Sequence, residues 1–118
     1  TMQFCTVAFS EIVVPEVPAF LSQEQISAFA ESIRQTGMLV QPVVVVSLTL
    51  ESNHLMSGRL QYEAWKLLRE EAYASGDQAE MLRYCDIPAI LVKRNEVKAA
   101  TSQLLRVEYE INLPYSEE

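Results

Sequence analysis

The residues with the clearest potential for chemistry are Ser57, Gly58 and Arg59, which follow a short apolar segment and open a predicted helix. The first turn of a helix carries N–H groups that have no intrahelical partner, and such groups bind anions such as phosphate. Glycine lets a ligand approach the backbone closely, and a guanidinium donates to phosphate oxygens. In a simpler interpretation, Ser57 only caps the helix. The sequence alone therefore leaves open both a phosphate site and a plain helix cap.

Other residue types that often do chemistry are sparse. The single histidine is His54, and the two cysteines, Cys5 and Cys85, form no CxxC pair and have no histidine near them in the sequence. We therefore expect neither a zinc site nor a disulfide framework, although one Cys5–Cys85 disulfide is an alternative to two buried thiols. His54 is expected to be an exposed residue beside a turn, because no paired acid or nucleophile is near it. No catalytic residue and no metal ligand is assigned.

The composition excludes several classes of function. The chain has 118 residues, of which 49% are hydrophobic and 21% charged, as in a single soluble globular domain. Its formal net charge is −7 and its basic residues are scattered, so direct DNA binding is not expected. No apolar run approaches the ~18 residues that cross a membrane. Without a signal peptide or a disulfide framework, we expect a cytoplasmic protein with reduced thiols.

The residue patterns alternate between strands and helices. A capping box begins at Ser22, Gly37 and Gly76 are placed to end helices, and four consecutive valines from residue 43 suit a buried strand. A turn at residues 51–53 is expected to form a hairpin. The predicted strands cover residues 4–14, 43–46, 54–56 and 87–92, and the predicted helices cover residues 22–37, 58–75, 77–84 and 95–112.

These elements predict one domain over residues 1–118, with a core at about residues 8–94 and a C-terminal helix at about residues 95–112. Helices and strands of this number and order are typical of the α+β class, with a small mixed β-sheet packed against about four helices. The stripe that contains Tyr62 and Trp65 has helical spacing, so we interpret it as core rather than as a base-stacking surface.

Four short motifs stand in a fixed order along the chain. They are Ser32-Ile33-x-x-x-Gly37, Pro42-Val43-Val44-Val45, Ser57-Gly58-x-x-x-Tyr62-Glu63-Ala64 and Ile87-Pro88-Ala89. This order, over residues 8–112, resembles the N-terminal domain of ParB-type partition proteins, which is often labelled nuclease-like and shares its fold with sulfiredoxin. The resemblance implies that fold. In the family, ParB proteins use this domain as a CTP-binding and CTP-hydrolysing switch, sulfiredoxins reduce oxidised peroxiredoxins with ATP, and other members are free-serine kinases.

The residues after Gly58 depart from both patterns. ParB proteins place Glu-Arg-Arg after this glycine, whereas this chain has Arg59-Leu60-Gln61, so only one of the phosphate-holding charges remains, offset by one position. Sulfiredoxins place Cys-His-Arg there, and Arg59 stands where their nucleophilic cysteine would be. Sulfiredoxin activity is therefore excluded.

Two further family motifs are also altered. Pro18-Ala19 lacks the arginine that ParB proteins carry in the first turn. Arg106-Val107-x-x-Glu110 replaces their Glu-Asn-x-x-Arg, whose acid and amide help to hold the nucleotide and its magnesium. An inserted segment lies around residues 70–84. The nucleotide site is thus expected to be degenerate in chemistry even where its shape persists.

Three hypotheses follow. The departures favour a non-catalytic ParB-like regulatory or protein-interaction domain, which meets a protein partner through its acidic surface and residues 70–84, beside a DNA-partition or transcription-related partner. A homodimer is expected by analogy with the family. The alternative is a nucleotide-binding switch that takes CTP or ATP with magnesium and holds the phosphates with Ser57, Gly58 and Arg59. The third hypothesis is a phosphotransferase or nucleotidase of the same fold, for which no base with a matched partner is found.

Overall fold

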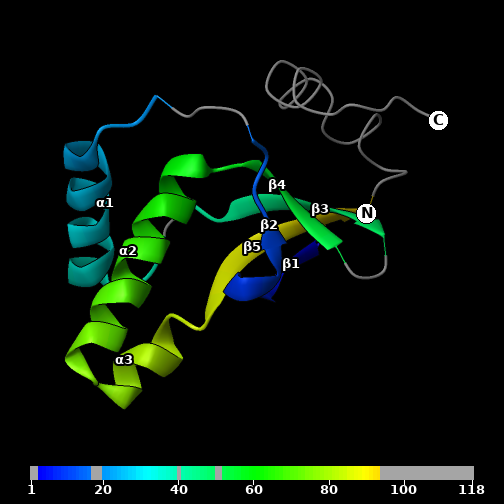
Figure 1. Ribbon diagram of the computed structural model, residues 1–118. Coiled ribbons are helices and arrows are strands. Elements are labelled where there is room, and N and C mark those ends of the chain that lie inside the picture. Colours follow the sequence, from blue (N-terminus) through cyan, green and yellow to red (C-terminus); the bar gives the residue numbers. More distant parts are fainter. Residues whose placement is uncertain (1–2, 17–19, 40, 50–51, 94–118) are drawn as a thin grey trace.

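Figure 1 shows the computed structural model, which describes residues 3–16, 20–39, 41–49 and 52–93. The strands are β1 (Gln3–Ala8), β2 (Ile12–Val13), β3 (Val43–Thr49), β4 (Ser52–Ser57) and β5 (Asp86–Lys93), and the helices are α1 (Gln23–Thr36), α2 (Arg59–Ser75) and α3 (Gln78–Arg83). A short 3-10 turn, η1 (Phe9–Glu11), joins β1 to β2. The expected C-terminal helix at residues 95–112 lies outside the described residues.

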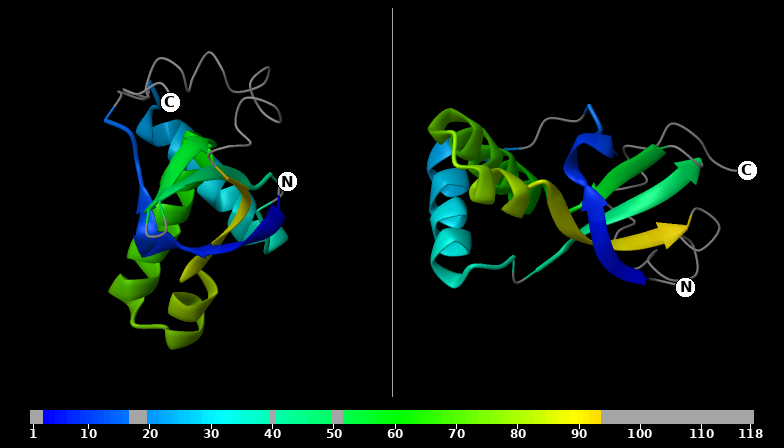
Figure 2. Two further views of the ribbon diagram at one scale, coloured as in Figure 1. Left: turned by 90° about the vertical axis from the view of Figure 1, so that its right-hand side faces the viewer. Right: turned by 90° about the horizontal axis from the view of Figure 1, so that it is seen from below.

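The five strands form one mixed sheet in the order β1-β5-β3-β4-β2. β3 runs parallel to β5 and β2 parallel to β4, whereas the β1–β5 and β3–β4 pairs are antiparallel. The three helices gather on one side of the molecule and the sheet lies on the other (Figures 1 and 2). The α+β class and the mixed sheet are therefore confirmed.

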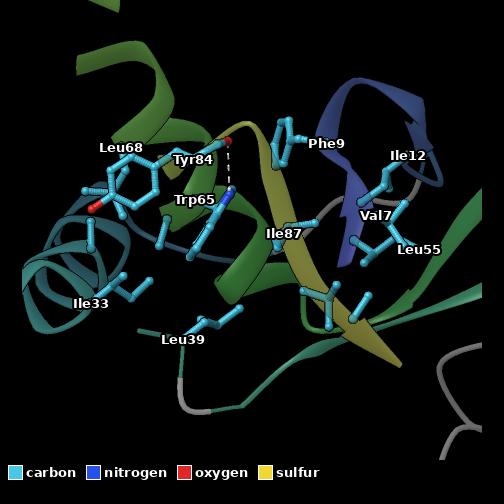
Figure 3. Packing of buried hydrophobic residues seen from close by; sticks show 14 of the residues in the cluster. Val7, Phe9, Ile12, Ile33, Leu39, Leu55, Trp65, Leu68, Tyr84 and Ile87 are labelled. Atoms are coloured by element: carbon cyan, nitrogen blue, oxygen red, sulfur yellow. Dashed lines mark hydrogen bonds between the residues drawn. The ribbon is translucent and has the colours of Figure 1, made fainter. Parts of the chain in front are cut away.

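The core forms where α2 meets the sheet. Trp65, Leu68 and Ala72 face inward at helical spacing, so the predicted apolar stripe of this helix is confirmed as core. Ile33 of α1 and Ile87 of β5 pack into the same cluster (Figure 3). Three of the four consecutive valines of β3, which lies between β5 and β4, are fully buried: Val43, Val45 and Val46. Val43 and Val45 belong to the core cluster that the helices pack against, whereas Val46 does not.

The ends of the longer helices follow the predicted signals. Ser22 Oγ accepts from the backbone N–H of Gln25 at 3.1 Å, and the Gln25 side chain accepts from the Ser22 N–H at 2.8 Å. This capping box is worth about 1 kcal/mol to α1. Gly37 and Gly76 end α1 and α2 in the left-handed conformation, with φ of 78° and 75°, where a side chain would be strained.

The predicted strand at residues 4–14 is divided in the structure. β1 pairs with β5 at one edge of the sheet, whereas β2 pairs with β4 at the opposite edge. One continuous strand cannot reach both edges, so the chain turns through η1, where the Phe9 N–H donates to the Cys85 carbonyl at 3.1 Å. Strand-forming side chains do not reveal which edge each residue will join.

The hairpin between β3 and β4 is present, but two expectations at its end were wrong. Asn53 already pairs with Ser47 inside β4, so the predicted turn at residues 51–53 is placed too late. His54 also lies in β4, where it is half-buried and pairs with Val46, rather than being an exposed turn residue. Burial lowers the pKa of His54 from its ordinary value, which favours the neutral imidazole.

A cluster around Arg69 joins α2 to the rest of the fold. Arg69 Nη1 donates to the carbonyl oxygens of Tyr84 at 2.9 Å and Cys85 at 3.2 Å, and its guanidinium lies 4.8 Å from the centre of the Phe9 ring. Phe9 in turn stacks on Tyr62, with ring centroids 4.5 Å apart. Trp65 Nε1 also donates to the Tyr84 carbonyl, at 3.2 Å. These contacts fix the middle of α2 against η1 and the start of β5.

The start of α2 is fixed by a close contact between Gly58 and Val43. Gly58 has a φ of 95°, and a Cβ atom placed on it would lie 3.0 Å from Val43 Cγ1 and 3.1 Å from Val43 Cα. Such separations are tighter than nine in ten Cβ contacts, so Val43 would have to shift by a few tenths of an ångström, in addition to the strain of a left-handed backbone. Only glycine therefore allows α2 to begin immediately after β4 and directly against β3.

We predict that Gly58→Ala lowers the free energy of unfolding by about 2–4 kcal/mol, the sum of left-handed strain and overpacking. Gly76→Ala is a matched control, because its backbone is also left-handed but nothing lies within 4 Å of the added Cβ. The control should lose only about 1 kcal/mol. Urea unfolding followed through the fluorescence of Trp65, the single tryptophan, measures both. Equal losses in the two variants would show that the contact with Val43 is unimportant.

Candidate functional site

The candidate site is the N-terminus of α2. Ser57 is the last residue of β4, and the cap position is occupied by Gly58, which has no side chain to make a capping hydrogen bond to the helix. Ser57 is therefore not the cap that the simpler interpretation assigned to it. The first turn of this helix contains no acidic residue. A helix of 17 residues carries about half a positive charge at such an end, which favours an anion.

Arg59 lies at the first position of α2 and forms an ion pair with Glu63. Arg59 Nε donates to Glu63 Oε2 at 2.9 Å, and the two side chains are 33% and 22% exposed. The sequence analysis did not identify Glu63 as this partner, although the spacing of four residues is the signal that favours such a pair on a helix. Pairs of this kind contribute only about 0.3–0.5 kcal/mol, so a bound phosphate can compete with Glu63 for the guanidinium.

Gly58 has a different role from the one that the sequence suggested. The direction in which its Cβ would point is filled by Val43, so the missing side chain does not leave room for a ligand there. Glycine is needed instead for the left-handed backbone and for the packing of α2 on β3. Its contribution to phosphate binding is therefore indirect, because it sets the direction in which the first-turn N–H groups point.

A pocket of about 160 Å³ lies between α1 and α2. Both helices start at the top of Figure 1 and run side by side. The pocket is lined by two residues of α1 and four of α2: Gln23, Ile26, Glu63, Lys66, Leu67 and Glu70. Glu63 thus belongs both to this pocket and to the ion pair with Arg59. The pocket is smaller than the sites of whole drug-sized ligands, which measure about 300–1,000 Å³.

Other expected site residues are only partly described. The altered family motifs at Pro18-Ala19 and at residues 106–110 lie outside the described residues. Cys5 is half-buried in β1, Cys85 is exposed, and both are free thiols rather than a disulfide. Among the residues that the structure describes, no three acidic, histidine or cysteine side chains are grouped so as to hold a metal ion. In the same residues, no helix combines the length and the apolar character needed to cross a membrane.

Comparison with known proteins gives matches only at the level of structure. No protein-family model matches this sequence, and no curated protein matches it. The C-terminally truncated chromosome-partitioning protein ParB from Caulobacter crescentus, complexed with CTP-gamma-S, superposes with a TM-score of 0.56 and 13% identity. That match covers 98% of this chain and 56% of ParB.

Two further solved structures are similar. SbnI with a C-terminal truncation, from Staphylococcus aureus, matches with a TM-score of 0.53 and 14% identity over 78% of this chain and 31% of its own. A free serine kinase in complex with AMP matches with a TM-score of 0.50 and 13% identity over 75% of this chain and 30% of its own. This chain thus spans less than a third of the length of SbnI and of the serine kinase, and just over half of the length of the ParB chain. Similarity at such low sequence identity supports a conclusion about the fold alone. The fold of this chain is ParB-like, as its ordered motifs predicted.

Proposed function

We propose that this domain is a non-catalytic, nucleotide-binding regulatory switch, in which the start of α2 receives the phosphates of CTP or ATP. The observation that carries the proposal is the N-terminus of α2, which has no side-chain cap and no acid in its first turn and has Arg59 at its first position. Phosphate oxygens supply the acceptors that such a helix start requires. The nucleotides held by the ParB and serine kinase structures support this choice of ligand.

The geometry at the start of α2 favours the nucleotide-binding switch over a domain that binds only proteins. The altered residues after Gly58 favoured a domain that binds only proteins. In the fold, however, the backbone N–H groups of the first turn carry out part of the recognition, and these groups do not depend on the lost Glu-Arg-Arg side chains. The degenerate motif thus removes charges from the site but keeps its helix dipole and its one guanidinium.

Nucleotide binding would affect the surface between α1 and α2 if Arg59 exchanged its ion-pair partner, Glu63, for a phosphate oxygen. Arg59 would hold a phosphate oxygen in place of Glu63, and the Glu63 carboxylate would then be available to hold the magnesium that accompanies a nucleotide. Glu63 also lines the pocket between α1 and α2, so the exchange changes the charge on that surface. This change is the output that a regulatory partner protein would recognise.

The residues at the start of α2 argue against hydrolysis of a nucleotide at this site. Phosphoryl transfer needs cations that neutralise the developing charge and a group that positions the nucleophile. Arg59 is the only cation in the first turn of α2, and the next two residues are Leu60 and Gln61. His54, the single histidine, lies half-buried in β4. We therefore assign no catalytic residue.

We predict that CTP or ATP with magnesium raises the melting temperature, and that Arg59→Gln abolishes the rise. A ligand at 100 times its dissociation constant adds about 2.7 kcal/mol of stability, which is several degrees for a domain of this size. A thermal-shift panel of CTP, ATP, GTP and ADP, each with and without magnesium, makes the measurement.

Arg34→Gln is the matched control for this panel, because Arg34 is also an ion-paired arginine on a helix but lies in the last turn of α1. It should keep the nucleotide-induced rise. A flat panel, or equal loss of the rise in Arg34→Gln, would contradict binding at the start of α2.

We further predict that Glu63→Gln raises the affinity for magnesium-free nucleotide by about twofold, because the ion pair between Arg59 and the Glu63 carboxylate no longer competes with the phosphate. The same variant should lose most of the gain that magnesium gives the wild-type protein. Isothermal titration with and without magnesium measures both effects. Weaker binding of the magnesium-free nucleotide would argue against the exchange of partners.

Protein recognition is a second candidate function, favoured by apolar side chains that residues 70–84 leave in solvent. Tyr73 of α2 is 60% exposed and Leu82 of α3 is 77% exposed. If a second copy of this chain is the partner, sedimentation velocity should show self-association that Leu82→Ser removes. Phe20→Ser, at a 95% exposed residue before α1, should leave it unchanged. A monomer at every concentration would exclude self-association through this surface.

A further inference from the structure

A second pocket lies at the other end of the paired helices, where α3 folds back against them. Its volume is about 150 Å³. It is lined by the last turns of α1 and α2, by α3 and by the residue that follows α3: Arg34, Leu68, Glu71, Ala72, Ser75, Glu80 and Tyr84. None of these residues belongs to the start of α2. The pocket is therefore separate from the site of the proposed nucleotide.

The electrostatics of this pocket favour a cation. Two carboxylates, of Glu71 and Glu80, line the pocket beside one guanidinium, that of Arg34. Outside the lining, Glu31 pairs with Arg34 and Arg83 pairs with Glu80. The C-terminal ends of α1 and α2 add partial negative charge, which Arg34 offsets in the last turn of α1, whereas the last turn of α2 contains no basic residue. Arg34 pairs with both Glu31 and Glu71, whereas the Arg83–Glu80 pair is longer, at 3.4 Å. Glu80 is therefore the carboxylate most able to accept a new partner.

Tyr84 gives an independent indication of a ligand. The residue is only 3% exposed, its ring packs edge-on against Trp65 at 5.0 Å, and its side chain points toward α1 in Figure 3. Among the interactions of the described residues, its hydroxyl makes no hydrogen bond. Burial, and then the nearby Glu80, raise the pKa of Tyr84, so the hydroxyl stays protonated at neutral pH. Buried hydroxyls are normally hydrogen-bonded, so the Tyr84 hydroxyl is available to a ligand in the pocket.

We propose that this pocket binds a small primary ammonium ion with a short alkyl body. The ammonium group donates to the Tyr84 hydroxyl oxygen and to the Glu80 carboxylate, and the alkyl body lies on Leu68 and Ala72. Ser75 Oγ donates to the Ala72 carbonyl at 2.9 Å and accepts from the Asp77 N–H at 3.2 Å, which leaves one lone pair of its oxygen for a further donor. The apolar side chains of Leu68 and Ala72 suit an organic cation better than a metal ion, which takes several oxygen ligands.

The test titrates n-butylammonium chloride into the full chain and follows the fluorescence of Trp65. This is the single tryptophan and it touches the Tyr84 ring. n-Butanol has a similar shape without the charge and serves as the neutral probe. We expect a saturable change with butylammonium and none with butanol at the same concentrations. A response that does not saturate, or equal responses to the two probes, would overturn the proposal.

Two single substitutions in the pocket test whether butylammonium binds there. Tyr84→Phe keeps the ring and should weaken butylammonium binding about fivefold, the equivalent of one hydrogen bond. Glu80→Gln should weaken it by at least as much, because the lost partner is charged. Glu24→Gln, at an exposed acid in the first turn of α1, is the matched control and should bind as the wild type does. Wild-type affinity in both pocket variants would show that the cation binds elsewhere. If Tyr84→Phe fails to fold, Glu80→Gln decides alone.

Discussion

The close contact between Gly58 and Val43 is the constraint on which the candidate site depends. Because no Cβ separates them, α2 begins one residue after β4 and lies directly on β3, the central strand of the sheet. The contact places the N–H groups of the first turn at a fixed point beside the sheet, together with Arg59. A longer connection would let the helix start move, and the anion site would lose its defined geometry.

The middle of α2 is held as firmly as its start. Arg69 and Trp65 both donate to the Tyr84 carbonyl oxygen, so one backbone group joins α2 to the chain that enters β5. The two ends of the helix consequently keep their positions, and they differ in charge. The N-terminal end carries Arg59 and no acid in its first turn, whereas the C-terminal end faces Glu71 and Glu80. The helix dipole reinforces this difference, which favours anions at the N-terminal end and cations at the C-terminal end.

Local signals predicted much of this fold because they act within a few residues. The capping box at Ser22 and the glycines that end α1 and α2 are confirmed for this reason. The break between β1 and β2 was not predicted, since the residues on both sides favour strands and only the pairing at opposite edges separates them. The position of His54 was wrong because the hairpin turn falls earlier than its polar residues suggested. The pocket beside Tyr84 could not be predicted, because it exists only where three helices meet.

The most direct test of the nucleotide site is a titration of the isotope-labelled protein with CTP and magnesium, followed through its backbone amide resonances. Binding at the start of α2 should produce the largest shifts at the N–H groups of Arg59, Leu60 and Gln61, because these groups would donate to phosphate oxygens. The amides of Gly37 and Gly76, at the opposite helix ends, should hardly change. Shifts confined to other parts of the chain, or none at saturating nucleotide, would contradict the site.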